Sequence, residues 1–328
     1  MSGVCEAPMQ PEHPPCPLCG GADGRSVVRI SDPLGLHAEP FGLRRCGGCG
    51  LFFTSPRPRP EQLGRYYEGV YSGPGGEAMF AAQTHEGLRY VNEARWRYVA
   101  RHLTLTPEDR VLDVGCGYGA FLAFVHGRSG ARLFGVDTDP GSIAGNLCRE
   151  HGDLRLGTVA EARFEEGSFA LISLLHSLEH MPDPVACLRE LRPLLRPGGL
   201  LLVEVPNFRS LLRPLLGRAW FPLLVPQHLA HFEPGTLGMA LERAGFVDRV
   251  ELRAAWCPFE LSSSLAQAVS GRLCLERRPP WLRRLAELFF LIVFVVVDLP
   301  LSLALVLLGR SGSLLALARG GVAARSTS

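Results

Sequence analysis

The stretch VLDVGCGYGAF, residues 111–121, decides the fold expected of this chain. It has the pattern of an apolar strand that enters a glycine-rich turn and then opens a helix. Gly115, Gly117 and Gly119 allow the backbone to approach a ligand where side chains would block it. Their spacing is GxGxG, not the GxGxxG of dinucleotide folds, and Asp113 lies on the strand just before them. The turn therefore predicts a nucleotide-type cofactor at the end of this strand.

The chain around this turn alternates short apolar runs with longer amphipathic ones from Arg110 onward. This βαβα rhythm predicts a mostly parallel sheet with helices on both faces. The segment FGVDTDP, residues 134–140, places Asp137 at the end of the next strand, where such folds present a carboxylate to ribose hydroxyls. A plain tight turn, with Asp137 as a helix cap, is the alternative interpretation.

Five segments resemble the ordered motifs of class I S-adenosylmethionine-dependent methyltransferases: VLDVGCGYGAF, FGVDTDP, SFALISLLHSLEHMPDP, LLRPGGLLLVEVPN and LERAGF. The resemblance covers residues 108 to about 253 and implies a doubly wound, seven-stranded, mostly parallel Rossmann-like sheet. It implies that Asp113 and the glycines hold the amino-acid part of S-adenosylmethionine and that Asp137 holds the ribose. Near adenine this chain offers Thr158, with Glu161 further on. The expected cofactor-binding residues are Asp113, Gly115, Cys116, Gly117, Gly119, Asp137, Thr138, Thr158 and His176.

The candidates for chemistry lie in HSLEH, after the fourth strand, and in PQHLAHF, in a Pro-rich segment. They are His176, Glu179, His180, His228 and His231. Methyl transfer from a sulfonium mainly needs alignment, and a base is needed only where the acceptor holds a proton. The cluster resembles the ExxEH motif plus distal histidine of small-RNA 2′-O-methyltransferases and ubiquinone-pathway O-methyltransferases, with His176 replacing the first glutamate. A divalent-metal site is one interpretation. We favour pocket lining and helix capping, with His228 or His231 as base or substrate contact.

Two CxxC pairs, Cys16 with Cys19 and Cys46 with Cys49, are flanked by glycines. The N-terminus has no secretory signal pattern, so a reducing compartment is expected and the pairs indicate metal ligands, not disulfides. Four thiolates at this spacing predict a structural zinc ribbon. A similar ribbon is found near this kind of domain in deoxysugar C-methyltransferases and related enzymes of surface-glycan assembly.

Residues 281–308 form the most apolar part of the chain, but Asp298 and Pro300 interrupt it. A carboxylate at the bilayer centre is costly, and a proline breaks a helix. The segment 313–321 has the pattern of a last strand that pairs antiparallel beside 247–253, which a single membrane crossing would prevent. We therefore favour a helical hairpin or bent element of two arms of about ten residues on a membrane surface. A true span and a buried dimer surface are the alternatives. Anionic headgroups would meet Arg272, Arg277, Arg278, Arg283 and Arg284.

The whole chain has 328 residues, of which 47% are hydrophobic, enough for at least one sizeable core. A net charge of +2 is too small to favour nucleic acid as a partner. The expected division is a flexible tail at 1–15, a zinc ribbon at 16–55, a linker with N-terminal helices at 56–107, a methyltransferase core at 108–255, an apolar helical insertion at 256–312, the final core strand at 313–321 and a tail at 322–328.

The expected function is methylation of a small or membrane-linked acceptor, such as a sugar, glycan or lipid intermediate, with O-methylation favoured. The enzyme is expected in the cytoplasm, peripheral on the inner face of the membrane, with a homodimer as an option. One alternative is an RNA methyltransferase whose ribbon holds nucleic acid. Another is a non-catalytic membrane adaptor that binds cofactor and zinc.

Overall fold

The computed structural model describes residues 11–31, 40–67, 86–273 and 280–320, and these ranges contain two sheets. The larger sheet has the strand order β10-β11-β8-β7-β4-β5-β6, and the smaller has the order β1-β2-β3-β9. The predicted tails up to residue 10 and after residue 320, the glycine-rich SGPGGE at 72–77, Arg277 and Arg278 lie outside the described residues.

The larger sheet confirms the predicted seven-stranded, mostly parallel fold. Its strands are β4 (Arg110–Val114), β5 (Arg132–Asp137), β6 (Gly152–Leu156), β7 (Phe169–Leu175), β8 (Leu195–Pro206), β10 (Val250–Ala255) and β11 (Ser313–Arg319). The strands β6, β5, β4, β7 and β8 pair in parallel, whereas β11 is antiparallel to β8 and β10. The carboxyl ends of the parallel strands therefore meet at one edge, where ligands bind in such folds.

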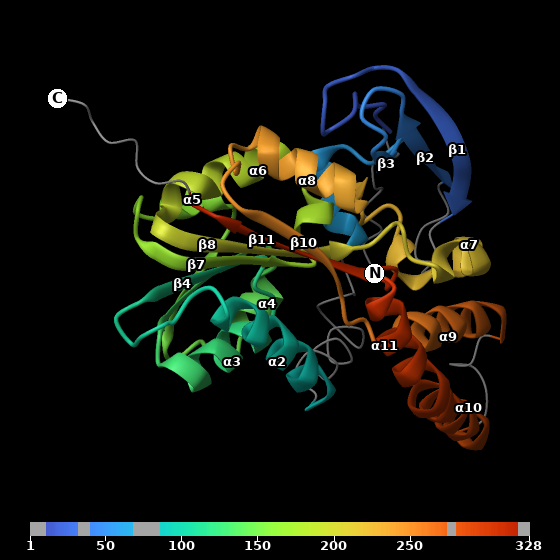
Figure 1. Cartoon of the computed structure of the whole chain (residues 1–328). Helices are drawn as coiled ribbons and strands as arrows, with labels where there is room; N and C mark the ends of the chain where they lie inside the picture. The colour runs from blue at the N-terminus through green and yellow to red at the C-terminus, as the bar shows by residue number, and fades with distance from the viewer. Residues whose placement is uncertain (1–10, 32–39, 68–85, 274–279, 321–328) are drawn as a thin grey trace, which may run out of the picture.

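Helices cover both faces of this sheet (Figure 1). One face carries α2 (Glu86–Ala100), α3 (Ala120–Ser129) and α4 (Pro140–Ala144), and the other carries α5 (Val159–Ala162), α6 (Pro184–Leu191) and α8 (Pro234–Arg243). Because both faces are covered, strand residues such as Leu171 and Leu201 are fully buried. The helix α4 is short and ends at Ala144, with Gly145 as its C-cap.

The N-terminal module joins the smaller sheet, which consists of β1 (Gly24–Ser31), β2 (Pro40–Cys46), β3 (Phe52–Thr54) and β9 (Ala230–His231). Short helical elements complete the chain: η1 (Pro60–Tyr66), η2 (Leu178–His180), η3 (Arg192–Leu194), α7 (Leu212–Leu216), η4 (Gly217–Ala219) and η5 (Phe221–Leu223). The strand β9 comes from the Pro-rich segment, and its His231 pairs with Phe52 of β3. The module is thus attached directly to the segment that carries two candidate histidines.

The C-terminal apolar region forms a helical arm that projects from the sheet (Figure 1). It contains α9 (Glu260–Leu273), α10 (Pro280–Val293), the π turn η7 (Phe294–Asp298) and α11 (Leu299–Leu307). The expected break between two ten-residue arms at Asp298 and Pro300 is wrong, because the helical chain continues through both residues. A π turn absorbs the irregularity beside the proline.

Asp298 is buried and does not interrupt the helical arm, because its carboxylate accepts hydrogen bonds from the start of another helix, α9. The backbone amides of Leu261 and Ser262 donate to it at 3.3 and 2.7 Å, and the Ser262 hydroxyl donates at 2.7 Å. The carboxylate therefore caps α9 from a distant point in the chain. Within the described ranges, no helix combines the length and the hydropathy that a bilayer crossing needs.

Candidate active site

The glycine-rich turn after β4 adopts backbone conformations that side chains would strain. Gly115, Gly117 and Gly119 have φ values of 70, 50 and 76°. An added Cβ would come within 2.6 Å of the Ser177 Cβ at Gly115 and within 2.2 Å of the Asn146 Oδ1 at Gly119. These two glycines thus allow the turn to pack tightly against the neighbouring loops.

Asp137 joins this turn to the end of β5. Its Oδ2 accepts the Gly117 amide at 2.8 Å, and its Oδ1 accepts the Asp139 amide at 2.9 Å. Burial raises the pKa of its carboxyl group. Asp137 is partly buried and Thr138 is exposed, so both lie at the edge where the cofactor ribose was expected.

The remaining expected cofactor residues have other partners within the protein. Asp113 is buried and accepts the Ser173 hydroxyl of β7 at 2.6 Å, and burial raises its pKa to about 7. Cys116 is buried, and burial raises its pKa. Thr158 caps α5 in a reciprocal capping box with Glu161. Asp113 therefore links β4 to β7, and Thr158 orders the loop after β6.

All five candidate catalytic residues gather beside the carboxyl ends of β7 and β8. The Glu179 Oε1 lies 3.5 Å from the His176 Nδ1 and 3.9 Å from the His228 Nε2. The rings of His180 and His228 are edge to face, with centroids 4.6 Å apart, and those of His228 and His231 are 6.4 Å apart. His176 has a φ of 56°, an uncommon conformation for a residue with a side chain and one that often marks functional sites.

Glu179 is buried, and neither of its carboxylate oxygens has a hydrogen-bond partner among the residues that the structure describes. His228 Nδ1 lies 2.8 Å from the Pro222 carbonyl oxygen, so this nitrogen donates and Nε2 is left as an acceptor toward Glu179. Ligand atoms of Glu179, His180 and His228 lie within 4.8 Å of one another. Converging acceptors of this kind suit a divalent cation held by imidazole and carboxylate.

Three of the candidate histidines differ in their titration. The His176 side chain is 44% exposed, and the neighbouring carboxylates of Glu179 and Glu204 raise its pKa to about 9. Burial, with His180 and His231 nearby, lowers the pKa of His228 well below its usual range. Burial, with Arg213 nearby, lowers the pKa of His231 to about 3. At neutral pH His176 is therefore charged, whereas His228 and His231 are neutral.

Sequence reasoning missed the ion pair that supports His176. Arg95 of α2 donates to the Glu204 Oε2 at 2.6 Å, and the Glu204 Oε1 lies 3.4 Å from the His176 Nε2. Although burial raises the pKa of Glu204, Arg95 and His176 lower it overall. The one signal in the sequence is a charged residue inside the apolar run LLLVEVP, because a buried carboxylate requires a partner.

A family model described as a methyltransferase domain matches residues 84–250, slightly more than half of the chain. The chain belongs to this methyltransferase family. It is an S-adenosylmethionine-dependent methyltransferase, and its glycine turn and Asp137 lie at the sheet edge expected for that cofactor.

This methyltransferase is similar to several known proteins. A ubiquinone biosynthesis O-methyltransferase of Xanthomonas campestris is 31% identical over 207 residues, covering 60% of this chain and 77% of the relative. One from Xanthomonas oryzae is 33% identical over 156 residues, covering 44% and 64%. The solved phosphoethanolamine N-methyltransferase 2 of Haemonchus contortus is 12% identical, with a TM-score of 0.54, covering 90% of this chain and 71% of that one. The last likeness supports the fold alone.

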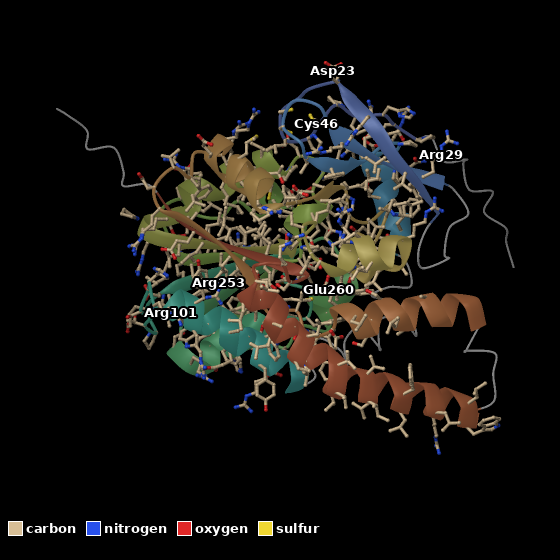
Figure 2. The ribbon with its side chains drawn as sticks, turned by 45° about the vertical axis from the view of Figure 1, so that its right-hand side comes forward. Asp23, Arg29, Cys46, Arg101, Arg253 and Glu260 are labelled. Atoms are coloured by element: carbon tan, nitrogen blue, oxygen red, sulfur yellow. The ribbon has the colours of Figure 1, made fainter. Side chains whose placement is uncertain are left out.

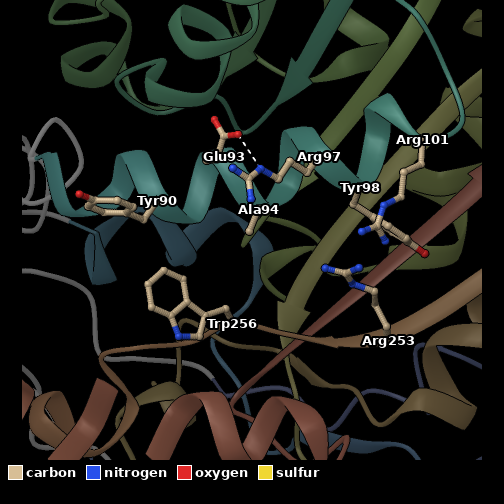
Figure 3. Close-up of a pocket in the computed structure, with 8 residues that line it drawn as sticks. All are labelled: Tyr90, Glu93, Ala94, Arg97, Tyr98, Arg101, Arg253 and Trp256. Atoms are coloured by element: carbon tan, nitrogen blue, oxygen red, sulfur yellow. Dashed lines mark hydrogen bonds and ion pairs between the residues drawn. The ribbon is translucent and has the colours of Figure 1, made fainter. Parts of the chain in front are cut away.

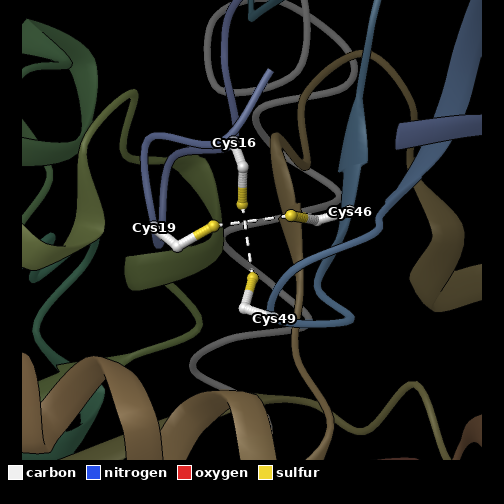
Figure 4. A group of neighbouring side chains, drawn as sticks. All are labelled: Cys16, Cys19, Cys46 and Cys49. Carbon is white, nitrogen blue, oxygen red and sulfur yellow. Dashed lines mark hydrogen bonds between the residues drawn. The ribbon is translucent and has the colours of Figure 1, made fainter. Parts of the chain in front are cut away.

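The methyltransferase also brings its four predicted zinc ligands together (Figure 4). The Sγ atoms of Cys16 and Cys49 are 3.5 Å apart, and those of Cys19 and Cys46 are 3.4 Å apart. All four lie within 4.8 Å of one another. Tetrahedral Zn–S bonds of about 2.3 Å place sulfurs about 3.8 Å apart, so this donor set fits a zinc ion.

The cysteine module supports the histidine segment. The Thr54 hydroxyl of β3 donates to the His228 carbonyl oxygen at 2.6 Å and lies 3.5 Å from the His231 Nε2. The module also shares one hydrophobic core with the sheet, in which Leu18 and Phe53 are buried. The ribbon is therefore packed as part of the methyltransferase and contacts its candidate site.

Proposed function

We propose that this methyltransferase transfers a methyl group to a hydroxyl of a lipid-linked or glycan-linked small molecule at the cytoplasmic face of a membrane. The observation that carries the proposal is the buried Glu179 carboxylate, which faces His176 and His228 beside the cofactor turn. The relatives named for O-methylation in ubiquinone biosynthesis support a hydroxyl as the acceptor.

A hydroxyl acceptor must lose a proton as its oxygen attacks the methyl group, so an acceptor of protons is required near that oxygen. His228 meets this need in geometry, because the Pro222 carbonyl fixes its tautomer with Nε2 free to accept. A divalent cation held by Glu179, His180 and the same His228 Nε2 would take the place of this base, because the cation would itself favour the ionised form of a bound hydroxyl. Positively charged His176, fixed by Glu204, would orient a polar group of the acceptor.

The cofactor residues are proposed in the same way. Gly115 and Gly117 are partly exposed at the turn and would let the methionine part of the cofactor approach the backbone. Asp137 would accept hydrogen bonds from the ribose hydroxyls. A structural zinc ion at Cys16, Cys19, Cys46 and Cys49 would hold the ribbon against the histidine segment.

The test is transfer of label from radioactive S-adenosylmethionine to fractions of a cell-envelope extract. We expect label in a lipid or glycan fraction with the unaltered protein, and at least about a hundredfold less with Glu179→Gln. Glu179 supports either the cation or the His228 base, and losing one positioned acid–base contribution costs roughly 10²–10⁴ in rate. Calorimetry with S-adenosylhomocysteine is the control, because Glu179→Gln should still bind it whereas Asp137→Ala should not. Label in RNA with none in lipid or glycan would overturn the proposal.

A further inference from the structure

A pocket outside the histidine cluster lies between α2 and the end of β10 (Figure 3). Its volume is about 290 Å³. Three arginines and three aromatic residues line most of it: Arg97, Arg101, Arg253, Tyr90, Tyr98 and Trp256. In Figure 3, α2 supplies one wall, and Arg253 reaches across from β10 toward Tyr98 and Arg101.

Three arginines and one glutamate line the pocket, so its walls carry a net positive charge. Arg97 pairs with Glu93 at 2.7 Å, and Glu93 also pairs with Arg128. Among the residues that the structure describes, neither Arg101 nor Arg253 has an ion-pair partner. The Arg253 guanidinium lies 4.3 Å from the centre of the Tyr98 ring, which holds it toward the cavity without using its donors. Guanidinium groups with free donors match the oxygens of a phosphate.

The arm beside this pocket exposes many large apolar side chains. The Trp256 Nε1, in the pocket wall, donates to the Ser302 hydroxyl of α11 at 2.9 Å, so pocket and arm are in contact. Large apolar side chains that are at least half exposed on the arm are Trp281, Leu285, Leu288, Phe289, Leu291, Ile292, Val295, Val296, Leu303, Leu307 and Leu308. Monomeric soluble proteins rarely expose apolar patches of this extent, which mark interaction sites.

We propose that this pocket binds the phosphate or diphosphate head of a membrane lipid, whose chains lie along the exposed face of α10 and α11. A cationic cavity next to an apolar surface matches the two ends of such a lipid. The proposal goes beyond the proposed function, because it concerns binding and requires no methyl transfer.

The position of the pocket would place a bound lipid next to the candidate active site. A smaller pocket of about 10 Å³ shares Ala94, Arg253 and Trp256 with it and is also lined by Arg95 and Glu204. The same Glu204 contacts His176 in the candidate active site. The Arg95–Glu204 ion pair would therefore separate a lipid phosphate held by Arg101 and Arg253 from the acceptor in the active site.

The test is flotation of the full chain with phosphatidylcholine vesicles that contain either phosphatidic acid or phosphatidylserine at matched surface charge. Arg101→Gln combined with Arg253→Gln should weaken binding to phosphatidic acid vesicles by at least about tenfold, since each arginine near an anionic surface contributes roughly fivefold to tenfold. The matched control is Arg132→Gln with Arg163→Gln. These residues are exposed near β5 and β6, at the far edge of the sheet, and remove the same charge.

Each result has a defined meaning. Preference for phosphatidic acid over phosphatidylserine that disappears in the pocket pair, but not in the control pair, supports the proposal. Equal losses in both pairs, or no preference for phosphatidic acid in the unaltered protein, would overturn it. Inorganic pyrophosphate is tested alone. If it binds the protein with the same affinity as the vesicles do, the pocket is a site for soluble phosphate compounds and the lipid assignment is overturned. No arm of this experiment depends on catalysis.

Discussion

Glu179 is the residue whose surroundings say most about the chemistry. A buried carboxylate without a hydrogen-bond donor is costly, by about 1–3 kcal/mol, and the charged His176 at 3.5 Å offsets only part of that cost. We expect Mn²⁺ to raise the melting temperature of the unaltered protein and to have no such effect on Glu179→Gln. Mn²⁺ is the appropriate probe because thiolates prefer zinc, so the four cysteines interfere little.

The control for this prediction is Glu190→Gln, which removes an exposed carboxylate from α6. It should respond to Mn²⁺ as the unaltered protein does. If Mn²⁺ stabilises Glu179→Gln equally well, the cluster does not hold the ion, and pocket lining with a histidine base is the better interpretation.

His176 offers a prediction about pH. Its pKa is raised to about 9 in the folded protein, above the usual value near 6.5, by Glu179 and Glu204. Its contribution to stability is therefore fully present below pH 6.5 and is lost as the pH rises toward 9. NMR titration of the imidazole should give a midpoint well above 7, and Glu204→Gln should lower that midpoint. A midpoint near 6.5 in the unaltered protein would contradict the assignment.

At the scale of elements, the helix α9 depends on a cap supplied 36 residues further along the chain. Asp298→Ala removes the acceptor for two backbone amides and the Ser262 hydroxyl. We expect a loss of about 1–3 kcal/mol in the free energy of unfolding, measured in urea, and faster proteolysis within the arm. Ser262→Ala, which removes one of the three donors, should lose less. Equal stability of Asp298→Ala and the unaltered protein would argue against the cap.

The ribbon is expected to affect catalysis through Thr54. Thr54→Val removes the hydrogen bond to the His228 carbonyl while keeping the shape of the side chain. We expect kcat/KM to fall by about tenfold, since a lost buried hydrogen bond costs roughly 1–1.5 kcal/mol, with unchanged affinity for S-adenosylhomocysteine. Thr54→Ser, which keeps the hydroxyl, should restore most of the activity. Loss of cofactor affinity together with activity would instead indicate general unfolding.

These elements also show what sequence reasoning can reach. The glycine turn, the strand pattern and the cysteine pairs are local signals, and they predicted the larger sheet and the meeting of the four cysteines. The cap on α9 and the pairing of Arg95 with Glu204 join residues 36 and 109 positions apart. No local pattern specifies such partners, which is why Asp298 was interpreted as an interruption of the arm.

At the scale of the whole molecule, the sheet separates two working surfaces. Figure 2 shows the zinc-ribbon module, with Cys46, at the top and the helical arm at the lower right. The ribbon supports the histidine segment through β3 and β9, and the arm borders the arginine-lined pocket. An acceptor attached to a lipid could thus be held by the arm and the pocket while its polar part enters the active site.

The apolar arm allows this arrangement to be tested separately from the pocket. Leu288→Ser with Ile292→Ser removes two side chains that are 52% and 53% exposed. If these two side chains enter a lipid layer, each substitution removes roughly 1.5–3 kcal/mol of favourable transfer free energy. Partition of the protein into phosphatidylcholine vesicles should therefore fall by at least about tenfold. With a lipid-linked acceptor KM should rise while kcat is unchanged, because the site of transfer is intact.

The matched control for the arm is Leu147→Ser with Leu156→Ser, two leucines that are 47% and 58% exposed near α4 and β6. These changes remove a similar exposed apolar area. If the control variant partitions into vesicles as the unaltered protein does, the effect of the arm pair comes from its position on the arm and not from a general loss of hydrophobicity. If the arm pair instead turned a dimer into a monomer and left vesicle partition unchanged, the exposed face would be a contact between two copies of the chain. The proposed attachment of the arm to a membrane would then be wrong.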